Sequence, residues 1–340
     1  MKLLVVRRDN IGDLVCTTPL FTALRRRFPQ AWIGALVNSY NAPVLERNPD
    51  LDEVIAYTKL KHVAGGRNAF AALRSRLSDL WRLRGMRLDY ILLATTDFVP
   101  RTARLARWLR PGQVVGFSDG SAQARRALDV AVPAAAGAGR HEVERVFALA
   151  RALGVDEAPP PLKVLADPAE VSAAAAAIGG SPPRVAVHIS ARRPAQRWPA
   201  ERWAALIERL HAEHRATVVL LWSPGPAGDA AHPGDDDKAQ DILRRVASGI
   251  RVVPYETRRL QQLIGALAAC DAVVCSDGGA SHLAAALGKP LVCFFGDSSA
   301  ERWRPWGVPL RLLQPPSRAV ADVSVEEAAQ AFAALRRPSA

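Results

Sequence analysis

Three segments of the sequence place polar residues where an apolar run gives way to a helical pattern. The first spans residues 7–13 and reads RRDNIGD. In open parallel sheets, ligands bind at the carboxyl ends of strands and at the starts of helices. Gly12 permits a tight turn there, and the carboxylate of Asp13 could act as a general base. An Asp at a helix start is also a common cap, and that simpler interpretation stays open.

The second segment, residues 188–199, reads HISARRPAQRWP. Small, hydroxyl and basic side chains lead into a helix start, and proteins build phosphate sites from such N–H groups and guanidinium groups. We therefore predict a phosphate site in this segment. The alternative is a solvated arginine loop. Trp198 is expected to pack in the core rather than to stack on a ligand.

The third segment, residues 275–282, reads CSDGGASH. Two consecutive glycines, Gly278 and Gly279, expose backbone N–H groups in a geometry that holds a pyrophosphate. Asp277 could instead be a helix cap, and His282 could be a core residue. Their position beside the two glycines favours a ligand site.

The sequence lacks the residue patterns of several other kinds of site. The first segment matches neither GxGxxG nor a P-loop, and the chain has no GxSxG elbow and no zinc-like spacing of His and Cys. Three aspartates at 235–237 could hold a divalent metal, but an exposed acidic loop before a helix is the simpler interpretation. The four cysteines form no CxxC pair and no disulfide framework. We expect no metal site and no cofactor.

Strands and helices must alternate to position these segments. Apolar runs predict strands at 2–7, 32–37, 53–57, 88–94 and 113–117, and then at 185–189, 217–222, 250–253, 272–275 and 290–295. Helical periodicity predicts helices at 14–28, 67–85, 99–109 and 141–153, and then at 200–214, 238–247, 257–269, 280–287 and 325–336. This alternation indicates an α/β fold made of βαβ units with parallel sheets.

A proline-rich stretch at 156–183 interrupts the alternation, which restarts after it. We therefore predict two Rossmann-like domains facing a central cleft, at 1–155 and 184–322, with 156–183 as their linker. The last helix lies in 323–340. No apolar run is long enough to span a bilayer, and residues 1–8 do not resemble a signal peptide. We therefore expect a cytoplasmic protein.

The charge of the chain is concentrated in one region. The 340 residues carry 45 Lys and Arg against 33 Asp and Glu, a net charge of +12, and residues 59–110 hold 12 basic residues against three acidic ones. Such a field attracts anions such as nucleic acid, anionic lipid or phosphorylated sugars. The alternative is a compositional bias, because the chain is rich in Ala, Pro and Arg. Nucleic-acid binding is the weaker interpretation, because aromatic residues are sparse around the basic cluster.

The three segments together resemble glycosyltransferase family 9, the lipopolysaccharide heptosyltransferases. The resemblance lies in RRDNIGDLVCTTPLFTALRRRFP at 7–29, HISARRPAQRWPAERWAAL at 188–206, SDGGASHLAAALGKPLVCFFG at 276–296 and RWRPWG at 302–307. It implies a GT-B fold in which the first domain binds the acceptor and the second binds the nucleotide sugar. It also implies that the last helix returns toward the first domain.

The resemblance implies an inverting, metal-independent transfer with Asp13 as the base. The donor would be a nucleotide sugar, by default ADP-heptose, and the acceptor an anionic glycolipid of the lipopolysaccharide core at the inner face of the cytoplasmic membrane. The residues that it implies for donor binding are Ser190, Arg192, Arg197, Asp277, Gly278, Gly279 and His282. In the basic cluster, the acceptor-binding candidates are Arg74, Arg76, Arg82 and Arg84.

The sequence departs from the family at two places. Gln196 stands where the family usually has Lys, and the loop at 222–229 has no clear Glu, although the family often places an acidic residue there to hold the donor ribose. Another nucleotide sugar or an acceptor outside lipopolysaccharide is therefore an alternative. A nucleotide-sugar epimerase with the same fold is a further one.

Overall fold

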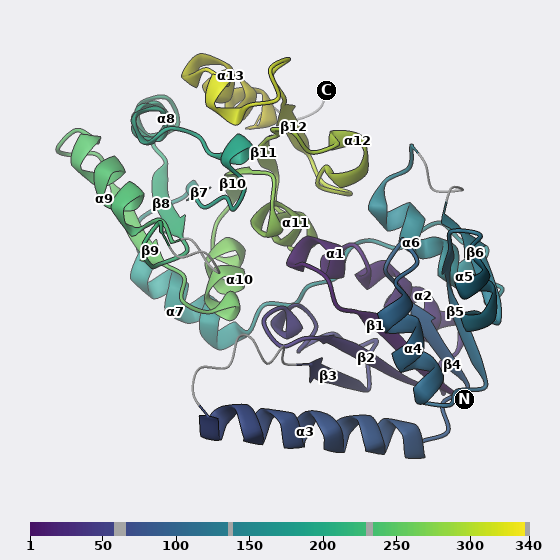
Figure 1. Cartoon of the computed structure of the whole chain (residues 1–340). Coiled ribbons are helices and arrows are strands. Elements are labelled where there is room, and N and C mark those ends of the chain that lie inside the picture. The colour runs from purple at the N-terminus through teal and green to yellow at the C-terminus, as the bar shows by residue number, and fades with distance from the viewer. Residues whose placement is uncertain (58–65, 135–138, 229–233, 337–340) are drawn as a thin grey trace. The chain divides into compact units, whose positions relative to one another are not determined.

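Figure 1 shows the computed structural model, which describes residues 1–57, 66–134, 139–228 and 234–336. The chain divides into two compact units, Met1–Val164 and Leu165–Ala340. The division falls inside 156–183, the stretch predicted to be a linker. Each unit is an α/β fold built on its own sheet of six strands.

The sheet of the first unit is parallel, with the strand order β3-β2-β1-β4-β5-β6. Its strands are β1 (Lys2–Arg7), β2 (Trp32–Asn38), β3 (Glu53–Tyr57), β4 (Tyr90–Leu93), β5 (Gln113–Ser118) and β6 (Val130–Pro133). β1 pairs with β2 on one side and with β4 on the other, so the strand order reverses there. Ligands of open α/β sheets bind at such a reversal, and β1 ends directly before the segment that contains Asp13.

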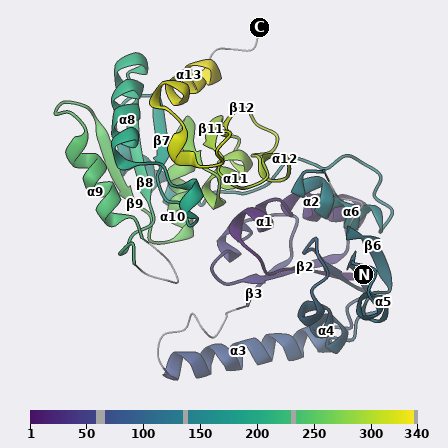
Figure 2. The ribbon, with the colours of Figure 1, turned by 45° about the horizontal axis from the view of Figure 1, so that its top comes forward.

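Helices cover the sheet of the first unit. They are α1 (Ile11–Val15), α2 (Thr18–Arg27), α3 (Gly66–Gly85), α4 (Pro100–Trp108), α5 (Ala122–Ala127) and α6 (Glu142–Arg151). Side chains of α3, α4 and α5 share one core cluster with the strands, among them Leu83, Ala103 and Ala124. α2 packs against α6. In both views of the molecule, α4 lies beside the C-terminal end of α3 (Figures 1 and 2).

The prediction of a single helix at 14–28 is wrong, because the chain forms two helices there. α1 ends at Val15 and α2 begins at Thr18, with Pro19 in its first turn. Proline has no N–H to donate and fits the first turn of a helix but not its interior. The hydroxyl of Thr17 donates to the carbonyl of Asp13, 2.8 Å away, and ties the break to the first segment.

The second unit repeats this plan with the strand order β12-β11-β10-β7-β8-β9. Its strands are β7 (Arg184–His188), β8 (Thr217–Trp222), β9 (Val252–Glu256), β10 (Ala272–Ser276), β11 (Leu291–Phe294) and β12 (Leu310–Leu313). The reversal lies at β7, which pairs with β8 and β10. His188 lies opposite Cys275 in this register. The second and third segments therefore leave neighbouring strands at the same edge of the sheet.

The helices of the second unit are α7 (Pro168–Ile178), α8 (Ala200–His214), α9 (Asp236–Arg245), α10 (Leu260–Ala268), α11 (Gly279–Ala286), α12 (Ala300–Trp303) and α13 (Val325–Arg336). α7 lies within the predicted linker but packs against α10. A Cβ on Gly265 would come within 2.8 Å of the backbone of Glu170, so the glycine permits this close approach.

The sequence patterns did not predict four short elements of the structure, which are β6, α5, α12 and β12.

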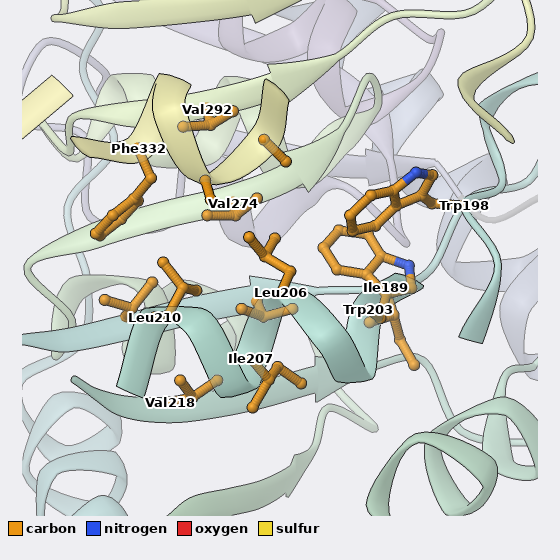
Figure 3. Packing of buried hydrophobic residues seen from close by; sticks show 14 of the residues in the cluster. Ile189, Trp198, Trp203, Leu206, Ile207, Leu210, Val218, Val274, Val292 and Phe332 are labelled. Atoms are coloured by element: carbon orange, nitrogen blue, oxygen red, sulfur yellow. The ribbon is translucent and has the colours of Figure 1, made fainter. Parts of the chain in front are cut away.

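Two tryptophans pack among mostly aliphatic side chains in the core of the second unit (Figure 3). Trp198 and Trp203 are buried with an edge-to-face geometry and ring centroids 4.7 Å apart. The indole N–H of Trp198 donates to the carbonyl of Val323, 2.8 Å away. The prediction that Trp198 packs in the core is confirmed. This packing fixes the segment that carries Arg197 directly before it.

α13 covers part of the same core. Phe332 is fully buried in it, and Arg209 of α8 forms an ion pair with Glu326. The return of this helix toward the first domain stays a prediction. No helix in the described part of the chain combines the length and the apolar character that a membrane span needs.

Candidate active site

Arg7, the last residue of β1, is buried among three carboxylates. One of its nitrogens, Nη2, lies 2.6 Å from Oδ1 of Asp13 and 2.9 Å from Oε1 of Glu142, and Nε lies 3.0 Å from Oδ2 of Asp9. Burial alone would lower the pKa of Arg7, but the charges of Asp13, Glu142 and Asp9 raise it above its ordinary value. A buried charge needs such compensation to be stable. Arg7 is therefore a fixed cation beneath the first segment.

Asp13 is oriented by three donors. Oδ1 faces Arg7, and Oδ2 accepts from the backbone N–H and the side-chain amide of Asn10, both at 3.0 Å. The simpler interpretation named the wrong residue, because Asn10 is the N-cap of α1 and Asp13, the third residue of the helix, accepts from the backbone of Asn10 in a capping box. A carboxylate offers about four acceptor positions, and the side chain keeps 15% of its surface exposed. Capping and a role as a base are therefore compatible, because one acceptor position is left for a substrate hydroxyl.

Glu142 completes this arrangement from the start of α6. Its side chain is fully buried, accepts from the hydroxyl of Thr96 at 3.3 Å and lies 3.8 Å from Nη1 of Arg145. The sequence patterns predicted neither Arg7 nor Glu142 as a site residue. The one sequence feature that could have marked Arg7 is its position, because it is a charged residue at the end of an apolar strand. Nothing in the sequence links it to a partner 135 residues away.

In the second unit, hydrogen bonds fix the loop after β7. The hydroxyl of Ser190 accepts from the backbone N–H of Ser223 at 2.9 Å. Nε of Arg197 donates to the carbonyl of Ala191 at 3.0 Å, and Arg192 is exposed. Hydrogen bonds therefore hold Ser190 and Arg197 at the carboxyl end of β7, while residues 192–194 of the same loop are exposed.

Gln196 joins the second segment to the third. Its buried amide donates to Oδ2 of Asp277 at 2.8 Å and to the hydroxyl of Ser298 at 2.9 Å. Burial raises the pKa of Asp277, while hydrogen bonds from Ser298 and Gln196 and the charge of Arg193 oppose this shift. Arg193 itself pairs with Asp297 at 2.7 Å. The residue that departs from the family pattern thus has a structural role here.

The start of α11 leaves room beside its backbone. A Cβ built on Gly278 would meet no atom within 4 Å. Gly279 opens the helix, and a helix start carries unpaired N–H groups and positive potential. His282 is buried one turn later, with its ring 6.2 Å from that of Trp303. Gly278 thus presents its backbone to open space, while His282 is buried, as the core interpretation expected.

Lys238 of α9 is a further cation at this edge of the sheet. Its Nζ donates to the carbonyl of Ile189, 3.1 Å away. Burial and, less strongly, the charge of Arg197 lower the pKa of Lys238 to about 8, while Asp235 opposes the shift. No carboxylate of the described residues lies within 4.0 Å of a nitrogen of Lys238 or Arg197. Two half-buried cations that pair with no carboxylate of the described residues suit an anionic ligand.

His188 lies under the same cations. Burial and the charge of Lys238 lower its pKa to about 4, so it is neutral near pH 7. No sequence pattern marks Lys238 as a site residue. A lysine that follows three aspartates on a helix is typical of a solvated face, and only the fold brings its amine back to the end of β7.

The basic cluster of the first unit is partly engaged. Arg82 forms an ion pair with Glu53, and the guanidinium of Arg84 donates to the carbonyl of Trp108. Arg74 is exposed, and the side chain of Arg76 lies outside the described part of the structure. Acceptor binding by these arginines stays a prediction.

The acidic loop at 235–237 has its own hydrogen bonds. Oδ1 of Asp236 accepts from the indole of Trp222 at 2.8 Å, and Oδ2 accepts from the backbone of Gly225 at 2.9 Å. These contacts fit the simpler interpretation of the loop. In the described residues, no group of three His, Cys, Asp or Glu side chains is placed to hold a metal ion.

Comparisons with known proteins agree with the two-unit architecture. Residues 77–330 match the model of glycosyltransferase family 9 (heptosyltransferase), which is more than half of the chain. The chain belongs to glycosyltransferase family 9. It is therefore a glycosyltransferase, as the resemblance predicted.

This family 9 member is similar to characterised proteins over most of its length. It is 29% identical over 315 residues to lipopolysaccharide heptosyltransferase 2 of Salmonella typhimurium. The matched region covers 88% of this chain and 84% of the relative. Among solved structures, a family 9 glycosyltransferase from Veillonella parvula is 19% identical with a TM-score of 0.82, covering 98% of this chain and 96% of the other.

A second solved structure resembles the family 9 chain equally completely. ADP-heptose lps heptosyltransferase II of E. coli is 24% identical with a TM-score of 0.77, and the match covers 98% of both chains. These likenesses, together with the two parallel sheets, show the GT-B fold. The predicted fold class is confirmed.

Proposed function

We propose that this glycosyltransferase moves a heptose from ADP-heptose to a sugar hydroxyl of the lipopolysaccharide core. The relatives are named as lipopolysaccharide heptosyltransferases, and one similar solved enzyme is named for ADP-heptose. The observation that carries the proposal is the Asp13 carboxylate, which three donors orient at the reversal point of the first sheet.

In the proposed reaction, Asp13 takes the proton of the acceptor hydroxyl. The oxygen attacks the anomeric carbon of the donor as the bond from that carbon to the phosphate oxygen breaks. The leaving nucleoside diphosphate keeps the electron pair, and the sugar configuration inverts. Arg7 holds the carboxylate in one orientation, which raises the fraction of productive encounters.

The leaving diphosphate needs positive charge as its bond breaks. Lys238 and Arg197 supply two cations at the carboxyl end of β7, and Ser190 lies in the same loop. Gly278 and Gly279 add the N–H groups of the α11 start, which binds anions. These groups together would stabilise the leaving group without a metal ion.

Asp277 and His282 belong to the same edge of the sheet but are buried. Gln196 occupies one oxygen of Asp277, so we assign Asp277 to holding the two loops in register. Arg192 is exposed in the loop after β7, and we assign it to contact with the donor. These donor roles, a membrane-bound glycolipid acceptor and action at the cytoplasmic face are parts of the same proposal.

A thermal-shift screen of nucleoside diphosphates and nucleotide sugars tests the donor class. A ligand that binds only the folded state raises the melting temperature. ADP and ADP-heptose are expected to give a larger shift than UDP, GDP or CDP and their sugars. A larger shift with UDP-sugars would contradict the ADP assignment. Epimerised sugar formed from the donor without acceptor would instead favour the epimerase alternative.

A further inference from the structure

Two tryptophans are exposed at the surface of the first unit. Trp81 of α3 is 62% exposed and Trp108 at the end of α4 is 39% exposed. Their ring centroids lie 5.4 Å apart with an interplanar angle of 74°. Leu77, one turn before Trp81 on the same helix, is 46% exposed. Large apolar side chains gathered in this way mark an interaction site more often than single exposed ones do.

Arg84 holds the indole pair in place. Its guanidinium lies 4.8 Å from the centre of the Trp108 ring and 5.9 Å from that of Trp81, and it also donates to the carbonyl of Trp108. On the neighbouring face of α3, Leu80 and Leu83 are buried in the core. The two indoles are therefore rigidly attached to the unit, so binding through them costs little side-chain entropy.

Arginines surround the indoles. Residues 74–110 contain nine arginines and three aspartates. Arg82 and Arg107 pair with Glu53 and Asp129. Arg74 on α3, Arg104 one turn before Trp108, and Arg110 after it are exposed. We call Leu77, Trp81 and Trp108, with Arg74, Arg84, Arg104 and Arg110, the indole patch.

We propose that the indole patch docks the first unit on the surface of an anionic lipid bilayer. Tryptophan favours the water–lipid interface, because its ring is apolar and its N–H is polar. Basic side chains near a membrane gain from anionic headgroups, and stable attachment needs apolar and electrostatic contributions together. The patch offers both on one surface formed by the end of α3 and the end of α4.

The geometry fits a bilayer better than a nucleic acid. Sequence-tolerant binding of single strands uses open aromatic faces on which bases stack. Here the two indoles meet edge to face, and Arg84 lies against both of them. An interfacial anchor needs only the apolar volume of the rings. The inference also gives Arg84 a role that differs from acceptor binding, since its guanidinium fixes the anchor.

Vesicle flotation with the full chain tests the proposal. We expect binding to phosphatidylcholine vesicles that contain phosphatidylglycerol, and little binding to phosphatidylcholine alone. The double variant W81S/W108S should bind the anionic vesicles at least about tenfold more weakly. Vesicles with brominated acyl chains should quench the tryptophan emission of the wild type but not that of the variant. Equal binding to both vesicle types, or unchanged binding by the variant, would overturn the proposal.

Matched variants distinguish an effect of the arginines in the indole patch from an effect of the net charge of the protein. R74Q/R104Q and R244Q/R258Q remove the same charge, and the second pair lies on the second unit, where both side chains are exposed. Only the first pair should weaken vesicle binding. Displacement of the protein from vesicles by a deacylated, phosphorylated core oligosaccharide would assign the patch to the acceptor and overturn the proposal. The far-ultraviolet spectrum and melting temperature report folding of each variant.

The proposal does not depend on the transfer reaction. Heptosyl transfer to a deacylated acceptor in solution should be unchanged in W81S/W108S, because this acceptor needs no membrane. Loss of vesicle binding with normal transfer in solution would support membrane docking and the proposed function separately. Loss of transfer to the soluble acceptor, with folding intact, would assign the patch to catalysis and overturn the docking proposal.

Discussion

A guanidinium nitrogen of Arg7 lies 2.6 Å from Oδ1 of Asp13, and the same nitrogen reaches Glu142 from the other side. The pair joins the last residue of β1 to the first turn of α1. Because Arg7 is buried, its position is set by the core and not by solvent. The carboxylate that we assign as base is therefore held by a fixed group of opposite charge.

Replacing Asp13 tests the base assignment. D13N keeps the size of the side chain but removes the proton acceptor. General-base catalysis typically contributes about 10²- to 10⁴-fold, so we expect kcat to fall by that factor. Affinity for ADP, measured by calorimetry, should stay the same, because the cations assigned to the donor lie in the second unit. D156N, at an exposed position, is the control and should keep full activity. Turnover of D13N at the wild-type rate would exclude Asp13 as the base.

Glu142 should matter for stability. Removing one partner of a buried ion pair leaves an uncompensated charge and costs about 3 kcal/mol or more. We therefore expect E142A to lower the free energy of unfolding by about that amount, measured by urea denaturation. E142Q keeps the shape and should lose less. An E142A variant as stable as the wild type would show that Asp9 and Asp13 alone compensate Arg7.

Because the pKa of Lys238 is lowered, we expect the affinity for the donor to depend on pH. Its pKa is lowered to about 8 in the free protein, and only the protonated amine attracts the diphosphate. The dissociation constant of ADP should therefore rise as the pH passes above about 8. K238Q should weaken ADP binding by about tenfold, equal to about 1.4 kcal/mol, and should flatten the pH profile between neutral and mildly alkaline pH.

K289Q is the matched control for this prediction. Lys289 donates to the carbonyl of Ala268 in the same unit, away from the end of β7. Its removal should leave both the affinity and the pH profile unchanged. An unaltered profile in K238Q, or an equal loss in K289Q, would remove Lys238 from the donor site.

Transfer should persist in EDTA. The positive charge for the leaving diphosphate comes from Lys238, Arg197 and the α11 start in the proposed mechanism, and Asp236 is occupied by Trp222 and Gly225. We expect the initial rate after chelation and gel filtration to match the untreated rate. A rate that vanishes and returns only with a divalent ion would direct attention back to residues 235–237.

Much of the fold followed from local patterns. The alternation of apolar runs and helical periodicity predicted most strands, because a buried parallel strand reads as a continuous apolar run. It failed where elements are short, such as β6 and β12, and at Pro19, where a helix that looked continuous is two helices. Propensity sums over long windows hide such breaks.

The candidate site was predicted only where its residues lie together in the sequence. Asp13, Ser190 and Gly278 follow apolar strands directly, and that position marks them. Arg7 and Glu142 meet because the start of α6 lies at the end of β1, and Lys238 contacts the end of β7 from a helix whose sequence pattern is that of a solvated helix. Such contacts depend on strand order and helix packing, which short-range spacing does not encode.

The most direct test is transfer itself. The purified chain is incubated with ADP-heptose and a heptose-deficient lipopolysaccharide core acceptor, and both products are identified by mass spectrometry. We predict an acceptor heavier by one heptosyl unit, one ADP released for each transfer, and inversion at the anomeric carbon. An acceptor left unchanged while ADP-heptose binds, or a heptoside that retains the donor configuration, would contradict it.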